Sequence, residues 1–140
     1  YTTLFRSFES KKQKGAEVDL SSVFANSVKK AVRTVILDQK DHLEVTDRLQ
    51  TGDKEAAVSW IMVTPAEAKI TGKNRMELTK DGQRMLLTVD ADTEVEMKTW
   101  SNVPPHEYDF RNPGTIRVGF ETVIPANRAV QLKVRLIPLK

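Results

Sequence analysis

The sequence contains no cysteine and only two histidines, His42 and His106, among its 140 residues. Without cysteine the chain forms neither a disulfide framework nor a thiolate zinc site, and this absence fits the cytoplasm and the periplasm equally well. Two histidines are too few for a multi-histidine metal site, and a Cys–His catalytic pair is excluded. We therefore expect no bound metal and no cofactor.

Catalytic sequence motifs are also absent. The chain has many serines and aspartates but no G-x-S-x-G, no P-loop and no H-E-x-x-H pattern. His42 follows an Asp-rich turn, where an exposed histidine without a special role is the favoured interpretation. The sequence thus assigns no catalytic residue.

Long apolar runs and a strong charge bias are missing as well. No apolar stretch approaches the length that spans a bilayer, so we expect no membrane segment. The 22 basic and 19 acidic residues leave a net charge of +3, which gives only weak attraction to polyanions. Aromatic residues are 6% of the chain and do not interleave with basic ones along a strand, which argues against a nucleic-acid-binding barrel.

The composition that is present is that of one soluble globular domain. Apolar residues make up 39% and charged residues 29% of the chain, and the apolar residues are spread over its whole length. We therefore expect a single domain over residues 1–140. The sequence begins at Tyr1 rather than at Met, so we also expect a processed chain or a piece of a longer one.

Alternation of apolar and polar residues with period two dominates the sequence and predicts strands. It is clearest over residues 130–136 and 116–124, which are separated by Pro125 and a short Ala-Asn turn. We expect these two strands to pair as a long antiparallel hairpin. A second hairpin is predicted from residues 29–38 and 42–50, around a turn from Asp38 to Asp41.

Further strands are predicted between turn signals along the middle of the chain. Val58, Trp60 and Met62 share one face of a strand, which places Trp60 in the core. Shorter strands are expected at residues 68–71, 75–79, 84–90 and 94–100. The regular turn spacing predicts an all-β, antiparallel, supersandwich-like β-sandwich with short turns and one long loop.

Two segments depart from this pattern. The stretch "LSSVFANSVKK", residues 20–30, is the only helix-like candidate, with Ser21 or Ser22 as its N-cap. The stretch "SFESKKQKGAE", residues 7–17, is predicted to be a charged surface loop.

The long loop "WSNVPPHEYDFRNPG", residues 100–114, joins two predicted strands and has two interpretations. Connections of this length are usually functional or disordered, and the prolines favour an ordered excursion. In one interpretation Trp100, Tyr108 and Phe110 plug the open end of the sandwich. In the other the loop contacts a carbohydrate through the four residues Trp100, His106, Tyr108 and Arg111.

The order of strand patterns and turns resembles a known family of enzymes. The segments that carry the resemblance are "AEVDLSSVF", "SVKKAVRTVILDQKDHLEVTDRL", "VSWIMVTPAEAKITGKNRMELTKDGQRMLLTV", "TWSNVPPHEYDFRNPGTIRVGFE" and "QLKVRLIPLK". Together they are similar to the C-terminal region of heparinase II/III-like polysaccharide lyases. The resemblance implies a large periplasmic or secreted enzyme in which an α/α-toroid precedes β-sandwich domains, acting on uronic-acid polysaccharides such as heparan sulfate or alginate.

The resemblance also implies where the chemistry lies. In such lyases a Tyr from the toroid and a His from a His-Asn pair supply the acid and base of a β-elimination. This sequence has no His-Asn pair, and neither His42 nor His106 matches the family motif. We therefore expect a non-catalytic C-terminal β-sandwich domain that supports upstream catalytic domains and lines the substrate cleft with its long loop.

Two alternatives from other functional classes stay open. A carbohydrate-binding module would use the loop over residues 100–114 to hold a glycan. A self-contained enzyme would need an acid and a base in one pocket, and His106 with Tyr108 or Glu107 is the richest cluster for that role.

Overall fold

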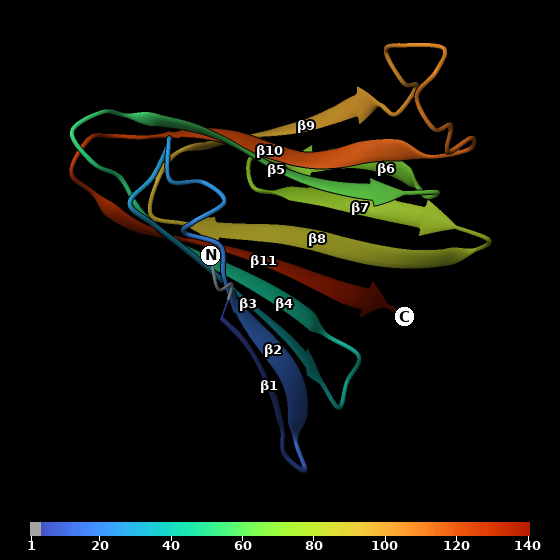
Figure 1. Cartoon of the computed structure of the whole chain (residues 1–140). Coiled ribbons are helices and arrows are strands. Elements are labelled where there is room, and N and C mark those ends of the chain that lie inside the picture. The colour runs from blue at the N-terminus through green and yellow to red at the C-terminus, as the bar shows by residue number, and fades with distance from the viewer. Residues whose placement is uncertain (1–3) are drawn as a thin grey trace.

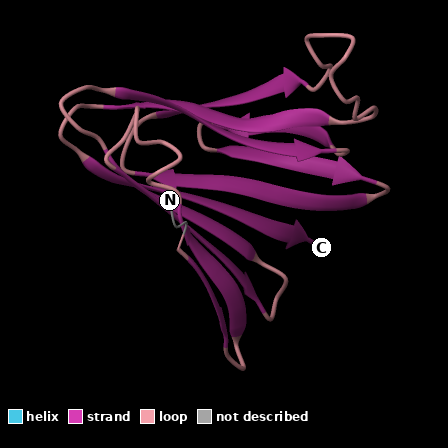
Figure 2. Ribbon diagram, viewed as in Figure 1, coloured by secondary structure: helices cyan, strands magenta, loops and turns pink. Residues whose placement is uncertain are grey.

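The structure is a computed structural model that describes residues 4–140, and it confirms an all-β sandwich (Figures 1 and 2). The described residues contain no helix, and hence none that is long and apolar enough to cross a membrane. The strands are β1 (Phe5–Glu9), β2 (Gln13–Asp19), β3 (Lys30–Asp38), β4 (Leu43–Gln50), β5 (Ala56–Thr64), β6 (Glu67–Gly72), β7 (Arg75–Lys80), β8 (Gln83–Ala91), β9 (Val95–Ser101), β10 (Ile116–Ile124) and β11 (Ala129–Leu139).

Two antiparallel sheets of unequal size form the sandwich. The larger sheet has eight strands in the order β1-β2-β3-β4-β11-β8-β7-β6, and the smaller has three in the order β5-β10-β9. Alternating side chains from both sheets meet between them, as period-two patterning requires. The fully buried members of this core include Phe120, Met76, Leu87, Leu132, Val118 and Val134.

The predicted hairpin between residues 116–124 and 130–136 is wrong, although both strands exist. β10 pairs with β5 and β9 in the small sheet, whereas β11 pairs with β4 and β8 in the large one. Residues 125–128 therefore cross between the sheets, and Thr51 fastens this crossing. Its hydroxyl donates to the carbonyl of Pro125 at 2.6 Å and accepts from the amide of Arg128 at 3.0 Å. Alternation shows which face of a strand is buried, but not whether its sequence neighbour lies beside it or opposite it.

The hairpin between β3 and β4 is confirmed. The two strands are antiparallel, and Asp38 shapes the turn by accepting hydrogen bonds from the amides of Lys40 at 2.7 Å and His42 at 3.0 Å. Trp60 is confirmed as a core residue, stacked on Phe120 with ring centroids 6.0 Å apart.

The two segments without clear alternation, residues 7–17 and 20–30, do not have the structures that the sequence predicts. Most of residues 7–17 belongs to β1 and β2, which form a hairpin rather than a loop. Residues 20–28 form turns instead of a helix. Ser21 is not a helix N-cap, because its hydroxyl accepts a hydrogen bond from the amide of Ala31 on β3. The amide of Ser21 in turn donates to the carboxylate of Asp19 at 2.9 Å. The segment is too short and too tightly tied to β3 to propagate as a helix.

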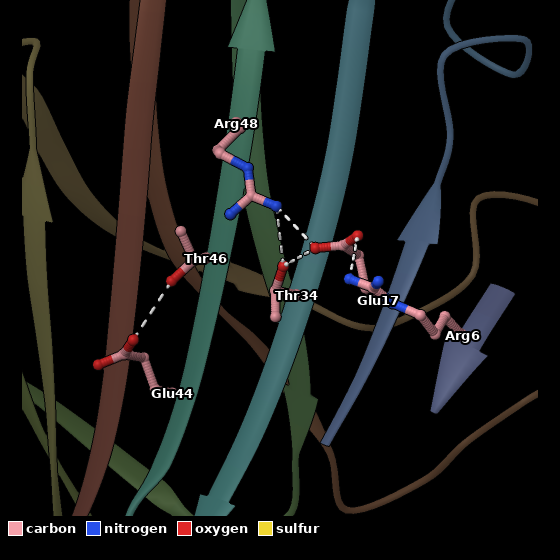
Figure 3. Close-up of polar contacts among 6 residues, drawn as sticks. All are labelled: Arg6, Glu17, Thr34, Glu44, Thr46 and Arg48. Atoms are coloured by element: carbon pink, nitrogen blue, oxygen red, sulfur yellow. Dashed lines mark hydrogen bonds and ion pairs between the residues drawn. The ribbon is translucent and has the colours of Figure 1, made fainter. Parts of the chain in front are cut away.

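A network of charged side chains stabilises the outer face of the first four strands (Figure 3). Glu17 on β2 accepts from Thr34 on β3 at 3.1 Å and from Arg48 on β4 at 2.8 Å, and Arg6 on β1 lies 3.3 Å away. The hydrogen bond from Thr34, followed by that from Arg48, lowers the pKa of Glu17 below its usual 4.5. Cross-strand polar pairs thus hold β1 to β4 together where no second layer covers them.

The small sheet covers only part of the large one. The core includes side chains of β4, β11, β8 and β7, and Ala31 and Val35 of β3 pack at its border. β1 and β2 extend beyond the small sheet (Figure 1). A hollow of about 420 Å³ lies on the inner side of this extension. Its lining comes from β1, β2 and β3 alone, and includes the apolar Ala16, Val35 and Leu37 and the charged Glu9 and Lys14. The large sheet therefore has an inner surface that the described residues leave open.

Candidate functional site

The long loop projects from one end of the small sheet, at the upper right of Figure 1. β9 and β10 pair antiparallel as far as Ser101 opposite Ile116, so residues 102–115 are the connection between two paired strands. The paired strands hold the two ends of the loop together. Any ligand contact that the loop makes is consequently carried on a rigid base.

Hydrogen bonds within the loop give it an ordered shape. The side-chain amide of Asn102 donates to the Thr115 hydroxyl at 2.7 Å, and that hydroxyl donates to the backbone carbonyl of Asn112 at 2.6 Å. At the tip, the amide of Asp109 donates to the carbonyl of His106 at 3.2 Å. Gly114 takes a φ of 74°, which suits the turn before β10.

The plug interpretation of the loop is wrong. Tyr108 is 84% exposed and Phe110 is 96% exposed, so neither ring enters the end of the sandwich. Trp100 is half-buried on β9, opposite Arg117 of β10. It shares its face of the strand with Lys98, and the core residue Met97 points the other way. The loop aromatics lie on the surface of the protein and do not fill its core.

Three of the four predicted contact residues come together in space. His106 and Arg111 both line a hollow of about 370 Å³ formed by the loop, and Tyr108 stacks on His106 with ring centroids 5.0 Å apart. Trp100 does not line this hollow. Glu107 lines it as well, which adds a carboxylate to the two nitrogen-bearing side chains.

This arrangement suits the binding of a polar ligand better than catalysis. A stacked His–Tyr pair offers an apolar face to a sugar ring, while the Arg111 guanidinium and the Glu107 carboxylate offer donors and acceptors. All these side chains are exposed, and an exposed site does not hold an acid and a base in fixed register. Among residues 4–140 no group of three or more metal-binding side chains occurs.

A second polar feature, between the sheets, was missed by sequence reasoning. Arg33 on β3 and Asp47 on β4 are directly opposite and form a two-point ion pair, with nitrogen–oxygen distances of 2.7 and 2.8 Å. The hydrogen bond from Arg33 to Asp47 raises the pKa of the guanidinium. The signal was present, because Arg33 and Asp47 interrupt the apolar face of their strands at paired positions. Arg48, the neighbour of Asp47 in the sequence, points to the other face of β4 and binds Glu17.

Comparison with known proteins identifies similar structures but no matching family model or curated protein. The sequence matches no protein-family model, and no curated protein matches it. Solved structures do match, over nearly the whole chain. A heparinase III crystal structure has a TM-score of 0.67 at 12% identity and covers 96% of this chain, and a second heparinase III has a TM-score of 0.66 at 16% identity and covers 99%.

The heparan sulfate lyase of Pedobacter heparinus matches with a TM-score of 0.62 at 15% identity, over 97% of this chain. In each case the chain spans only 21 to 22% of the solved protein's length. The fold that the family resemblance implied is therefore confirmed. The chain has the fold of one domain of heparinase III-type lyases.

Proposed function

We propose that this chain is a non-catalytic β-sandwich domain of a heparinase III-type polysaccharide lyase. The observation that carries the proposal is the match of 96 to 99% of this chain to 21 to 22% of such lyases. The long polysaccharide-cleaving protein would supply the acid and base from its other domains. This chain would support those domains, and the substrate would be an acidic polysaccharide of the heparan sulfate or alginate type.

The residues of this chain support a non-catalytic role. His42 lies 3.3 Å from Asp38 in a strand-connecting turn, and His106 lies in the exposed loop, so the two histidines are in different parts of the fold. Neither is enclosed with a second acid–base group in a water-excluding pocket, which proton abstraction beside a uronate would require. A lyase with such a domain would act in the periplasm or outside the cell.

The experiment compares a longer polypeptide that contains this domain with the same polypeptide truncated before Tyr1. We expect truncation to lower the melting temperature of the remaining domains and the yield of unsaturated uronate from heparan sulfate together. Unchanged stability and activity after truncation would show that this domain does not stabilise the remaining domains.

A second candidate function, glycan contact by the loop, is favoured by the exposure of Tyr108 and its stacking on His106. Calorimetric titration with heparan sulfate and alginate oligosaccharides tests it. We expect saturable binding that a His106→Ala, Tyr108→Ala double variant abolishes and an Arg111→Ala variant weakens. Trp100→Ala is the matched control, because Trp100 neither lines the hollow nor stacks on His106. The absence of heat with both sugars would refute glycan contact.

A further inference from the structure

β5 is an edge strand without the features that normally protect an edge. It pairs only with β10 among the described strands, so its other side carries unpaired backbone groups over nine residues. Its sequence, AAVSWIMVT, contains no charge, no proline and no bulge. Natural edge strands avoid pairing with other chains by being short, charged or bulged.

The three other sheet edges carry such protection. β1 is five residues long and contains Arg6 and Glu9, and β9 contains Glu96 and Lys98. β6 contains charged residues and an irregular register between Ile70 and Gly72. Among the described strands, β5 is thus the sheet edge that lacks such protection.

The surface beside β5 is open and mixed in character. The apolar side chains of Ala16, Val35 and Leu37 lie there beside the charged side chains of Glu9 and Lys14. Phe5, at the far end of this surface, is 68% exposed. On the outer face of β5 itself, Ile61 is 43% and Val63 is 48% exposed. A strand added along β5 would lie over the inner faces of β2 and β1 and over the part of β3 that β5 does not cover.

A buried polar group without a hydrogen-bond partner lies near the same edge. A hollow of about 340 Å³ lies between β5, the strands β3 and β4 and the turn segment of residues 20–28, and its lining includes Trp60, Arg33 and Asp47. The Nε1 of Trp60 is buried and has no hydrogen-bond partner among the described residues. A buried N–H without an acceptor is costly, and a polar side chain of an added strand that points into this hollow would supply an acceptor.

We propose that the edge of β5 is an interaction surface for an extended strand of the same longer polypeptide, which continues the small sheet over β3, β2 and β1. This inference rests on the proposed function, because it takes the strand from the remaining four fifths of a lyase-length chain. The strand pairs through its backbone, and its inward side chains are apolar where they meet Val35 and Leu37.

A second copy of this chain fits the edge poorly. In an antiparallel pair of β5 strands, the axis relating the copies is perpendicular to the sheet, so both large sheets lie in one layer. The partner's large sheet would then occupy the space that β1, β2 and β3 already fill. Steric exclusion thus favours a strand without its own attached sandwich.

Hydrogen exchange of backbone amides tests the proposal in two proteins, this 140-residue chain and a longer polypeptide that contains it. We expect alternate amides of β5 (Ala56–Thr64) to exchange at least about tenfold more slowly in the longer protein, because added pairing protects them. The free-edge amides of β9 (Val95–Ser101) are the matched control and should exchange alike in both. Equal exchange of β5 in the two proteins would overturn the proposal.

Two further readouts separate the other outcomes. Light scattering of the 140-residue chain should show a monomer, and β5 protection that grows with its concentration would mean that a second copy occupies the edge, which also overturns the proposal. Lyase activity of the longer protein is measured separately. Activity without β5 protection would refute the added strand alone, whereas β5 protection without activity would refute the proposed function alone.

Discussion

Breaking the ion pair between Arg33 and Asp47 is expected to cost different amounts from its two sides. The side chain of Asp47 is 11% exposed, whereas that of Arg33 is 39% exposed. Removal of Arg33 leaves a buried carboxylate without a partner, while removal of Asp47 leaves a guanidinium that can turn toward water. The difference in burial predicts that Arg33→Ala is the more destabilising change.

The magnitudes follow from the same geometry. Removing one partner of a fully buried pair costs about 3–5 kcal/mol, and the partial exposure of Arg33 reduces this to about 2–3 kcal/mol for Arg33→Ala. Asp47→Ala loses two charge-assisted hydrogen bonds but leaves no buried charge, so we expect about 1 kcal/mol. The double variant removes the orphaned carboxylate and should be more stable than Arg33→Ala alone.

Urea unfolding followed by the fluorescence of the core Trp60 measures these differences. Arg33→Met is the control for packing, because it keeps an unbranched side chain of similar length while removing the charge, and it should be nearly as destabilised as Arg33→Ala. Equal losses for Arg33→Ala and Asp47→Ala, or a double variant whose loss is the sum of both, would refute the reasoning.

Three further predictions concern the fold. Thr51→Val should lose about 1–3 kcal/mol in urea unfolding, because it leaves buried partners at the sheet crossing unsatisfied, and no loss would contradict that role. Gly119→Ala places a methyl carbon 1.8 Å from the carbonyl of Trp60 and should cost at least about 3 kcal/mol, whereas Gly82→Ala, with nothing within 4 Å, should cost about 1 kcal/mol; equal costs would refute the close approach. Because the pKa of Glu17 is lowered in the folded state, its contribution is complete above pH 4.5 and is lost as the pH falls through the folded value, so Glu17→Gln should show a shallower loss of stability in acid than the unaltered chain.

The sequence predicted the strands well because each buried face imposes period two on its side chains. The predicted pairing of residues 29–38 and 42–50 is confirmed, because Asp38 closes the turn between them by accepting hydrogen bonds from the amides of Lys40 and His42. Residues 116–124 and 130–136 have equally clear alternation, yet they lie in different sheets. Local patterning records burial and turn length, and it does not record which distant strand lies alongside.

The candidate site was predicted in its location rather than in its details. Prolines and length marked residues 100–114 as an ordered excursion, and three of the four contact residues do converge there. Trp100 does not, because the strand continues to Ser101 and holds its side chain on the sheet face. The exposure of Tyr108 was not predictable, because an aromatic residue in a loop fits either a plug or a surface.

For β5, the sequence predicted the buried face of the strand but not its position at the edge of a sheet. Its sequence is that of a core strand, and the alternation of Val58, Trp60 and Met62 was interpreted as such. Only the order of the sheet reveals that one side of this strand has no partner among the described strands. The absence of charged residues from β5 is unusual only for an edge strand, so it could be interpreted only with the sheet topology.

The most direct test of the central claim is an assay of the 140-residue chain alone on heparan sulfate, following the ultraviolet absorbance of unsaturated uronate. We predict that the chain alone forms no product, while a longer polypeptide that contains it forms product under the same conditions. Formation of unsaturated uronate by the 140-residue chain itself would contradict the account, because it would require an acid and a base that the described residues do not bring together.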